Sequence, residues 1–311
     1  MRPKFSFASS SSRPSPLGWV CLVSLALGFG ALGLHAQALP AGRTSPGIGL
    51  YSTFEGSSSI SGTVFDMSNT VSYNFTKHLG VDLTVPVYFV LPPLTPVKGI
   101  ASSTTGLGNV ALDAHLTIPL LFVDYSPTGT IAFPTGSTTK GFSTGAVTYD
   151  LDNRFEHDFG IVSPFIEVDI GNSVNNMSSP RRRVIRRPFL TFGNMAQFTA
   201  GPEIQILGRL TVSADAYKVV PWGPQTVFSR IVKPGKTGVG GTHHRVYEIS
   251  QITGGGANLV EDDGFDASIA FSPTRYLDLT VAANHSIFYS LDTISLSVGL
   301  NVSQILARSH R

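Results

Sequence analysis

Apolar residues recur at every second position in segment after segment of this chain. The runs LGVDLTVPVYF (79–89), NVALDAHLTI (109–118), SPFIEVDI (163–170) and TISLSVGLNV (293–302) are clear examples. Side chains of a β-strand point alternately to its two faces, so this pattern predicts strands with one apolar and one polar face. The chain is therefore expected to be all-β.

Alternation alone does not separate a soluble β-sandwich from a membrane β-barrel, because both contain strands with one apolar face. Only 14% of the residues are charged, against about 25% in ordinary soluble domains. After residue 38 the sequence contains no apolar run long enough for a membrane-spanning helix. A transmembrane up-and-down antiparallel β-barrel predicts this combination, because its lipid-facing surface needs only every second residue to be apolar.

The first 38 residues have the features of a secretory signal peptide. Arg2, Lys4 and Arg13 precede a short apolar stretch that ends in Ala36-Gln37-Ala38, an A-x-A cleavage site. An uncleaved anchor helix is the alternative, and the cleavage site favours removal. We therefore expect a signal peptide at 1–38, a barrel at 39–311, and a location in the outer membrane of a Gram-negative bacterium. Cys21 is the only cysteine, so the mature chain has neither disulfides nor thiolate metal ligands.

Twelve strands are expected along the chain. Their ranges are 47–56, 68–76, 79–89, 107–118, 127–134, 145–155, 160–171, 189–201, 208–219, 264–272, 276–285 and 292–303. The links TKHLG, EHDFG, ILGR and SPTR are tight, whereas the links after the odd-numbered strands are mostly long and polar, among them EGSSSISG and a large loop at about 220–263. Outer-membrane barrels have short periplasmic turns and longer external loops, so both termini are expected in the periplasm.

Two stretches fit this pattern less simply. The run HRVYEISQI (244–252) resembles a thirteenth strand. Because counting it in the wall breaks the even number of strands, we assign it to a hairpin inside the large loop. The link PLLFVDYSP (119–127) is longer than the pattern predicts.

The stretch TTGLGNVALDAHLTI (104–118) contains Gly106, Gly108 and Ala111 at the spacing of a dinucleotide-binding turn. That motif binds a pyrophosphate only where it follows a strand and opens a helix. Here the glycines follow a small polar stretch and precede alternating residues, so the sequence predicts a strand and no nucleotide site. Gly106 and Gly108 are interpreted as glycines that turn the chain into that strand.

Several segments carry a family resemblance. TGLGNVALDAHLTI, TIAFPTGSTTKGFSTGAVTYDLDNRFEHDFG, SPFIEVDIGNS and the hairpin YNFTKHLGVDLTVPVYF resemble an outer-membrane β-barrel family proposed to contain transporters linked to the meta-pathway of phenol degradation. The resemblance covers residues 47–303, with Asn109 where the family usually has Asp. It implies a barrel that passes small, often hydrophobic or aromatic solutes, without catalytic residues or a cofactor.

The predicted inward-facing side chains are strongly acidic. They are Asp82, Asp113, His115, Asp150, Asp152, Arg154, Glu167, Asp169, Asp215, Asp266 and Asp278. Rings of carboxylates favour cations in a water-filled pore; the structural alternative is that polar residues must face inward in any such barrel. Arg154 is expected to form a network with the carboxylates near the turn at 156–160, either lining the pore or closing it with salt bridges.

The run RRRVIRR contributes Arg181, Arg182, Arg183, Arg186 and Arg187 to a predicted external loop. Arginine binds phosphate through its planar fork, so this run could pair with lipopolysaccharide; a solvated loop is the alternative. Removing the three basic residues of the signal peptide from the 22 Lys and Arg leaves 19 against 20 Asp and Glu. That balance argues against nucleic-acid binding.

Enzymatic function is the weaker hypothesis. Asn284-His285-Ser286 suggests a membrane serine lipid hydrolase, but adjacent residues of a strand point to opposite sides. His243-His244 is a weak metal motif. The sequence thus predicts a channel or transporter for small solutes with an acidic lumen, with no cofactor, metal or nucleic acid. A structural or surface-binding barrel with a closed lumen is the alternative.

Overall fold

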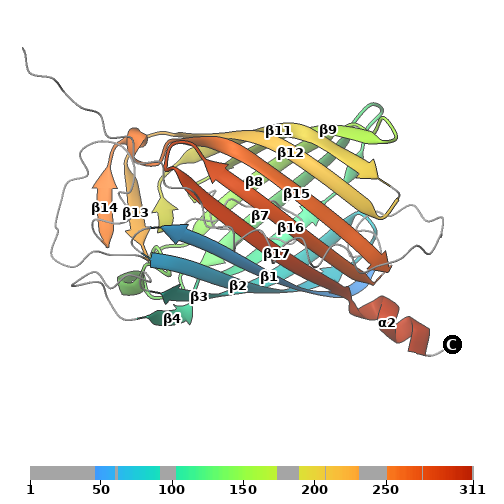
Figure 1. The fold of residues 1–311 in the computed structure, drawn as a ribbon, viewed down its shortest axis with the longest axis horizontal. Coiled ribbons are helices and arrows are strands. Elements are labelled where there is room, and N and C mark those ends of the chain that lie inside the picture. The colour runs from blue at the N-terminus through green and yellow to red at the C-terminus, as the bar shows by residue number, and fades with distance from the viewer. Residues whose placement is uncertain are drawn as a thin grey trace, which may run out of the picture. The chain divides into compact units, whose positions relative to one another are not determined.

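The computed structural model describes residues 46–59, 62–91, 103–173, 189–206, 208–230, 251–274 and 276–309. Residues 1–45, which include the predicted signal peptide, lie outside this part of the chain. Twelve antiparallel strands form a closed barrel (Figure 1). They are β1 (Gly47–Ser59), β2 (Gly62–Asn74), β3 (Leu79–Leu91), β5 (Val110–Leu116), β7 (Asp124–Phe133), β8 (Thr148–Glu156), β9 (Val162–Gly171), β11 (Met195–Ile206), β12 (Leu210–Pro221), β15 (Asp262–Thr274), β16 (Leu277–Ser286) and β17 (Leu291–Asn301).

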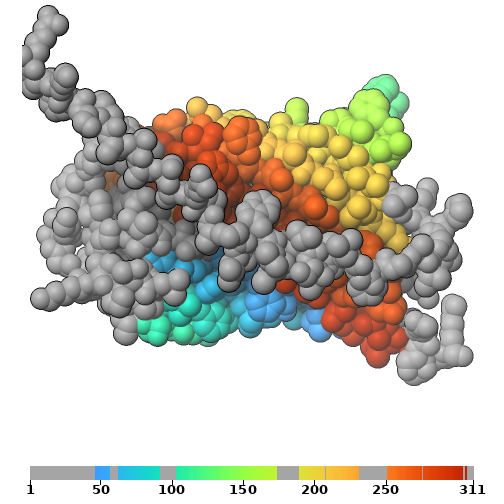
Figure 2. All heavy atoms as spheres, viewed as in Figure 1, coloured from blue at the N-terminus to red at the C-terminus, as the bar shows by residue number. Residues whose placement is uncertain are grey.

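The first and last strands close the barrel. β1 pairs with β17 from Gly49↔Asn301 to Ser57↔Thr293, and every other wall strand pairs with its neighbours in chain order. Figure 2 shows blue N-terminal strands and red C-terminal strands on the same face of the barrel, as this closure requires. Two short strands, β4 (Thr104–Leu107) and β6 (Ile118–Pro119), extend the wall at β3 and β7. The predicted fold class is confirmed.

Burial alternates along each wall strand. On β3, Asp82 and Thr84 are buried, whereas the apolar side chains of Leu83 and Phe89 are exposed. Exposed apolar side chains recur in the same way around the whole wall, and the buried wall positions are largely polar. An apolar outer surface of this kind is unfavourable in water and favourable in lipid. The closed barrel also leaves no unpaired backbone groups exposed to lipid. The protein is therefore an outer-membrane β-barrel.

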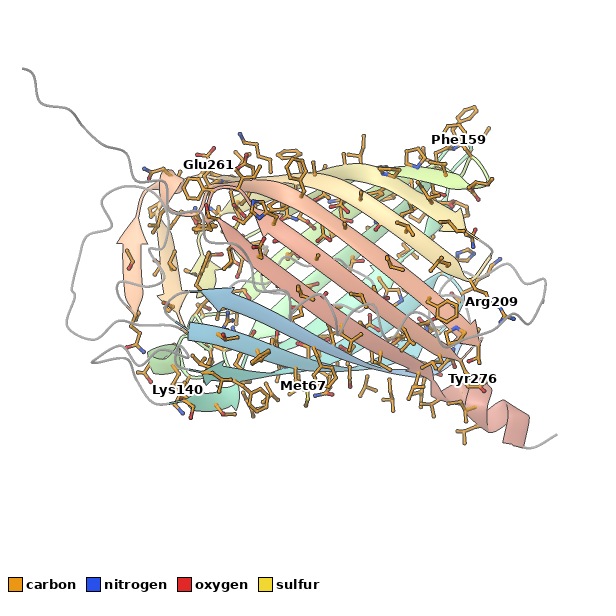
Figure 3. All side chains as sticks on the ribbon, viewed as in Figure 1. Met67, Lys140, Phe159, Arg209, Glu261 and Tyr276 are labelled. Atoms are coloured by element: carbon orange, nitrogen blue, oxygen red, sulfur yellow. The ribbon has the colours of Figure 1, made fainter. Side chains whose placement is uncertain are left out.

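The two ends of the barrel differ. Turns at 75–78, 120–123 and 157–161 connect strands at one end, where β11 and β15 also finish, β1 begins and β17 finishes. Figure 3 shows Phe159, Arg209 and Tyr276 at this end, and Lys140 and Glu261 at the other. Short turns identify the first end as periplasmic, and the opposite end carries the longer connections, so it is external.

Two predicted links are wrong. β1 and β2 remain paired as far as Ser59↔Gly62, so EGSSSISG belongs mostly to two strands, and β2 begins at residue 62 rather than 68. The link 119–127 is a tight turn, because β6 and β7 continue the pairing and Leu120 donates its N–H to the Val123 carbonyl. Strands can extend beyond the lipid with hydrated polar side chains, so a polar composition marks the edge of the membrane and not the end of a strand.

The predicted strand 189–201 is also interrupted. Its first four residues form β10 (Phe189–Phe192), which leaves the wall and pairs with β13 (Gln225–Ser229). Gly193, with φ +151°, makes the break, since other residues rarely adopt this conformation. β13 in turn pairs with β14 (Ile252–Gly255), and the short helix η4 (Ala257–Leu259) follows.

Within the predicted large loop, β13 and β14 pair with each other outside the wall. Residues 231–250, which contain most of the run 244–252, lie outside the described residues. At the other end of the chain the last strand finishes at Asn301, not 303, and continues as the helix α2 (Val302–Ser309). No helix among the described segments is long and apolar enough to cross a membrane.

Candidate functional site

The predicted inward-facing acidic residues are buried on the interior face of the wall. Asp82, Asp113, His115, Asp150, Asp152, Glu167, Asp169, Asp215 and Asp266 are all buried, and Arg154 is nearly so. Asp278 is half-buried near the periplasmic end, where Ser272 donates a hydrogen bond to it at 2.6 Å. Exposed apolar side chains occupy the alternate positions of the same strands. The interior therefore carries many carboxylates contributed by most of the wall strands.

Four pairs of these carboxylates are direct cross-strand neighbours. They are Glu55↔Asp66, Asp82↔Asp113, Asp152↔Asp169 and Asp215↔Asp266. Directly opposed like charges destabilise a sheet. A barrel that only needed polar filling would not require this arrangement, so the repeated pairing points to a use for the negative charge.

Asp152, Glu167 and Asp169 form the closest acidic group. Each offers one carboxylate oxygen, and these oxygens lie within 4.8 Å of one another. Oxygen ligands suit hard cations, but Ca²⁺ takes six to eight of them. Three side chains supply fewer, so this geometry suits a cation that keeps part of its water better than a dehydrated, permanently held metal.

Arg154 is close to three glutamates. Its guanidinium lies 2.6 Å from Glu156, 2.9 Å from Glu203 and 3.7 Å from Glu167, and its Cζ lies 3.9 Å from the centroid of the Phe165 ring. The predicted network of Arg154 with carboxylates near this turn is therefore present. It includes the predicted Glu167 and also Glu156 and Glu203, which were not among the predicted residues. It lies near the periplasmic ends of β8 and β11, where one guanidinium compensates several carboxylates.

His115 belongs to a second buried group. Its Nδ1 lies 3.5 Å from Asp82, and its Nε2 lies 3.3 Å from the side-chain oxygen of Asn74. The neighbouring Asp113 accepts a short hydrogen bond from Thr130, which faces Asp150 on the next strand. Polar contacts thus link β2, β3, β5 and β7 along the interior face.

A cap covers the external end of the barrel. We use this name for β10, β13, β14 and the segment 134–147, which includes the short helix η1 (Thr138–Lys140); Figure 1 shows β13 and β14 at that end. On one side, Phe189 and Val227 of the cap pack with the wall residues Tyr217, Val219 and Leu291. On the other side, Phe142 of the cap packs with Val64 and Tyr88.

The two sides of the cap meet at Gly141. A Cβ at this position would overlap the carbonyl of Ser229, so only glycine allows the approach. The cap therefore reaches from β12 and β17 to β2 and β3, across the mouth.

The hydrolase hypothesis is not supported by the positions of its two residues. The Ser286 hydroxyl is buried and donates to Asp262 at 2.7 Å. The His285 side chain is exposed on the opposite face and lies 2.8 Å from Asp292. Because the histidine points away from the hydroxyl, it is not positioned to act as its base. The predicted strand 107–118 is present mainly as β5, but Gly106 lies in the short strand β4, paired with Tyr88, and not in a turn. No helix follows the glycines there, as a dinucleotide site would require.

Sequence reasoning missed several residues of the interior. Glu55 and Asp66 fit the alternation. Glu55 lies at the end of the first predicted strand, and Asp66 lies before the start of the second. Glu203 and Asp262 also fit the alternation of strands longer than predicted. Arg230, which follows β13, has no periodic pattern that could reveal its position. The predicted basic run, from Arg181 to Arg187, lies outside the described residues.

No protein-family model matches the sequence, and no curated protein matches it either. Among solved structures, the fold is similar to that of an outer membrane channel from Pseudomonas putida F1, with a TM-score of 0.52 and 11% identity over 85% of this chain and 97% of that one. It is also similar to the NanC porin, with a TM-score of 0.48 and 8% identity over 81% of this chain and 99% of that one. For the KdgM porin in complex with disordered oligogalacturonate, the TM-score is 0.46 and the identity 8%, over 81% of this chain and 98% of that one. At 11% identity, the similarity to the Pseudomonas channel shows the fold alone.

Proposed function

We propose that the mature chain, from Leu39, is a channel that passes small solutes across the outer membrane and that its acidic interior favours cations. The observation that carries this proposal is the set of four opposed carboxylate pairs on the interior face of the wall. Like charges held this close in a narrow pore attract cations strongly, because the protein around them screens charge less than bulk water does.

The group of Asp152, Glu167 and Asp169 is the proposed centre of selectivity. Its three oxygens lie close enough for one cation to contact all of them. Asp113, Asp150, Asp215 and His115 would extend the polar path. This acidic path would end at Arg154 near the periplasmic end, since Arg154 neutralises part of the negative charge there.

Conductance of the refolded mature protein in a planar bilayer under a salt gradient tests the proposal. An open, acidic interior gives steady channels whose reversal potential indicates cation preference. A silent bilayer, from protein shown to be folded and inserted, would contradict it.

A barrel with a closed interior is the second candidate, and the cap is the observation that favours it. Phe142, Phe189 and Val227 bring apolar packing to the external mouth. In that case the external surface binds a partner and the protein does not conduct. The same bilayer measurement therefore distinguishes the two functions.

Two further proposals concern partners. The resemblance to the phenol meta-pathway family supports hydrophobic or aromatic solutes, which uptake of labelled phenols into proteoliposomes would test. The run at 181–187 would bind lipopolysaccharide phosphate, because arginine forks match phosphate oxygens. Replacing its five arginines by glutamine should then reduce the lipopolysaccharide that copurifies with the folded barrel; unchanged copurification would indicate a solvated loop.

A further inference from the structure

Arg230 of the external connection lies on an aromatic ring of the barrel wall. Its Cζ is 3.9 Å from the centroid of the Tyr88 ring, and both side chains are buried. Arg230 directly follows β13 of the cap, whereas Tyr88 is an interior-facing residue of β3. The contact therefore joins the cap to the wall across the mouth.

The wall residues beside this ring are acidic. Asp66 is the cross-strand partner of Tyr88, and Glu55 is the cross-strand partner of Asp66. Both carboxylates are buried on the same interior face. Opposed residues on one face have Cβ atoms about 5 Å apart, so the ring and both carboxylates form one surface. We call Tyr88, Asp66 and Glu55 the Tyr88 site.

The chain also makes room for the Tyr88 ring. Phe142 stacks on Tyr88 at 5.4 Å between ring centroids and 20° between planes. A Cβ at Gly108 would overlap the Tyr88 ring, and one at Gly106 would lie 2.8 Å from the Phe142 ring. These two glycines, singled out in the sequence by their spacing, are thus needed for the aromatic stack and not for a nucleotide.

An aromatic face beside carboxylates is the chemistry that recognises guanidinium and alkylammonium groups. The ring quadrupole attracts the cation, and the contact is worth more when water is excluded. Guanidinium is also planar and weakly hydrated, so it stacks on a ring at low cost. The three residues of the Tyr88 site belong to the wall, so the site does not depend on Arg230 for its shape.

We propose that the Tyr88 site binds the guanidinium or alkylammonium group of a small solute, and that Arg230 occupies it as an internal ligand which such a solute displaces. This rests on the proposed function as a channel, because the solute must reach the external mouth. Solutes with such groups are organic cations, a class that suits an acidic interior. Displacing Arg230 removes one of the contacts that hold the cap on β2 and β3.

Hydrogen exchange of the mature protein in detergent tests binding without requiring conduction. Arg230→Gln should raise exchange of the backbone amides of 138–145 and 225–229 about fivefold, the effect of losing a contact of about 1 kcal/mol. Millimolar methylguanidinium should raise exchange of the same amides in the wild type towards the rate of Arg230→Gln, because it displaces Arg230, whereas sodium at equal ionic strength should not. The matched control is Arg209→Gln, which removes a guanidinium that donates to the Pro273 carbonyl at the periplasmic end.

Two variants of the ring keep the test decisive if Arg230→Gln does not fold. Tyr88→Phe retains the aromatic face and should leave exchange of the cap unchanged, whereas Tyr88→Leu should raise it and abolish the methylguanidinium effect. Methylguanidinium without effect on the wild type, or equal exchange in the Phe and Leu variants, overturns the proposal.

Bilayer recordings separate this inference from the channel itself. Arg230→Gln should conduct more than the wild type, and methylguanidinium on the external side should raise the conductance of the wild type towards that of the variant. If the wild type and the variant are both silent while methylguanidinium still raises exchange of the cap in the wild type, the binding site stands and the channel function fails. If the wild type conducts and exchange does not respond to methylguanidinium, the channel stands and the Tyr88 site fails.

Discussion

Asp152 on β8 and Asp169 on β9 lie directly opposite each other, and both side chains are buried on the interior face of the barrel. A neighbouring pair of like charges lowers the stability of a sheet by up to about 1 kcal/mol. Stability alone would favour replacing one of them. The negative charge proposed to attract cations therefore lowers the stability of the barrel at this pair. Substituting the two residues can measure the effect on selectivity and the effect on stability.

Replacing Asp152 and Asp169 together by asparagine should move the reversal potential towards zero, because two negative charges leave the proposed centre of selectivity. Thermal unfolding of the variant should occur at an equal or higher temperature, since the like-charge repulsion is removed. The control is Asp292→Asn, because Asp292 is 81% exposed on the outer face. A double variant with unchanged selectivity and an unaltered control would exclude these residues from the conduction path.

Arg154→Met should destabilise the barrel by about 3 kcal/mol, because it leaves Glu156, Glu167 and Glu203 without their shared cation. Denaturant unfolding of the refolded protein measures this loss. Cation preference should increase in the same variant, since the positive charge near the periplasmic end is removed. Lys218→Gln is the control: its pair with Glu261 spans 3.8 Å between exposed side chains, so little change is expected. Equal stability of the two variants would mean that the Arg154 network contributes nothing measurable.

The sequence predicts the wall well because two physical constraints act on it together. Lipid requires an apolar residue at every outward position, and the interior requires a polar one, so the alternation alone assigns Asp82, Asp113 and Asp169 to the correct face. Turn residues such as those of TKH between β2 and β3 also locate the periplasmic ends.

These constraints lapse outside the membrane, and the prediction fails there. The end of β1 and the start of β2 have a polar sequence that resembles a loop, although their backbones remain paired. The cap has no fixed period, since its position depends on contacts between residues distant in sequence, such as Phe142 with Tyr88 and Gly141 with Ser229. The position of Arg230 is unpredictable from the sequence for the same reason.

Ser286→Ala tests the enzyme hypothesis and the buried network together. Because His285 faces away from the hydroxyl, we expect no lipid hydrolysis by the wild type and no change in this respect in the variant. The variant should instead lose about 1–2 kcal/mol of stability, because Asp262 loses a donor at 2.7 Å. Detergent phospholipase assays and denaturant unfolding give the two readouts. Hydrolysis by the wild type that disappears in Ser286→Ala would contradict the assignment of this serine to structure.

Gly141→Ala should loosen the cap while the wall stays folded. Gly141 has φ +67°, which costs other residues about 1–2 kcal/mol, and its Cβ would also overlap the Ser229 carbonyl. Gly160→Ala separates these effects, because Gly160 has φ +92° but nothing within 4 Å of its Cβ position. The backbone strain is similar in the two variants, so any excess effect of Gly141→Ala measures the contact between the two sides of the cap. We expect faster proteolysis after Arg230 and a higher conductance in Gly141→Ala only, whereas equal behaviour of the two variants would show that the cap does not depend on this approach.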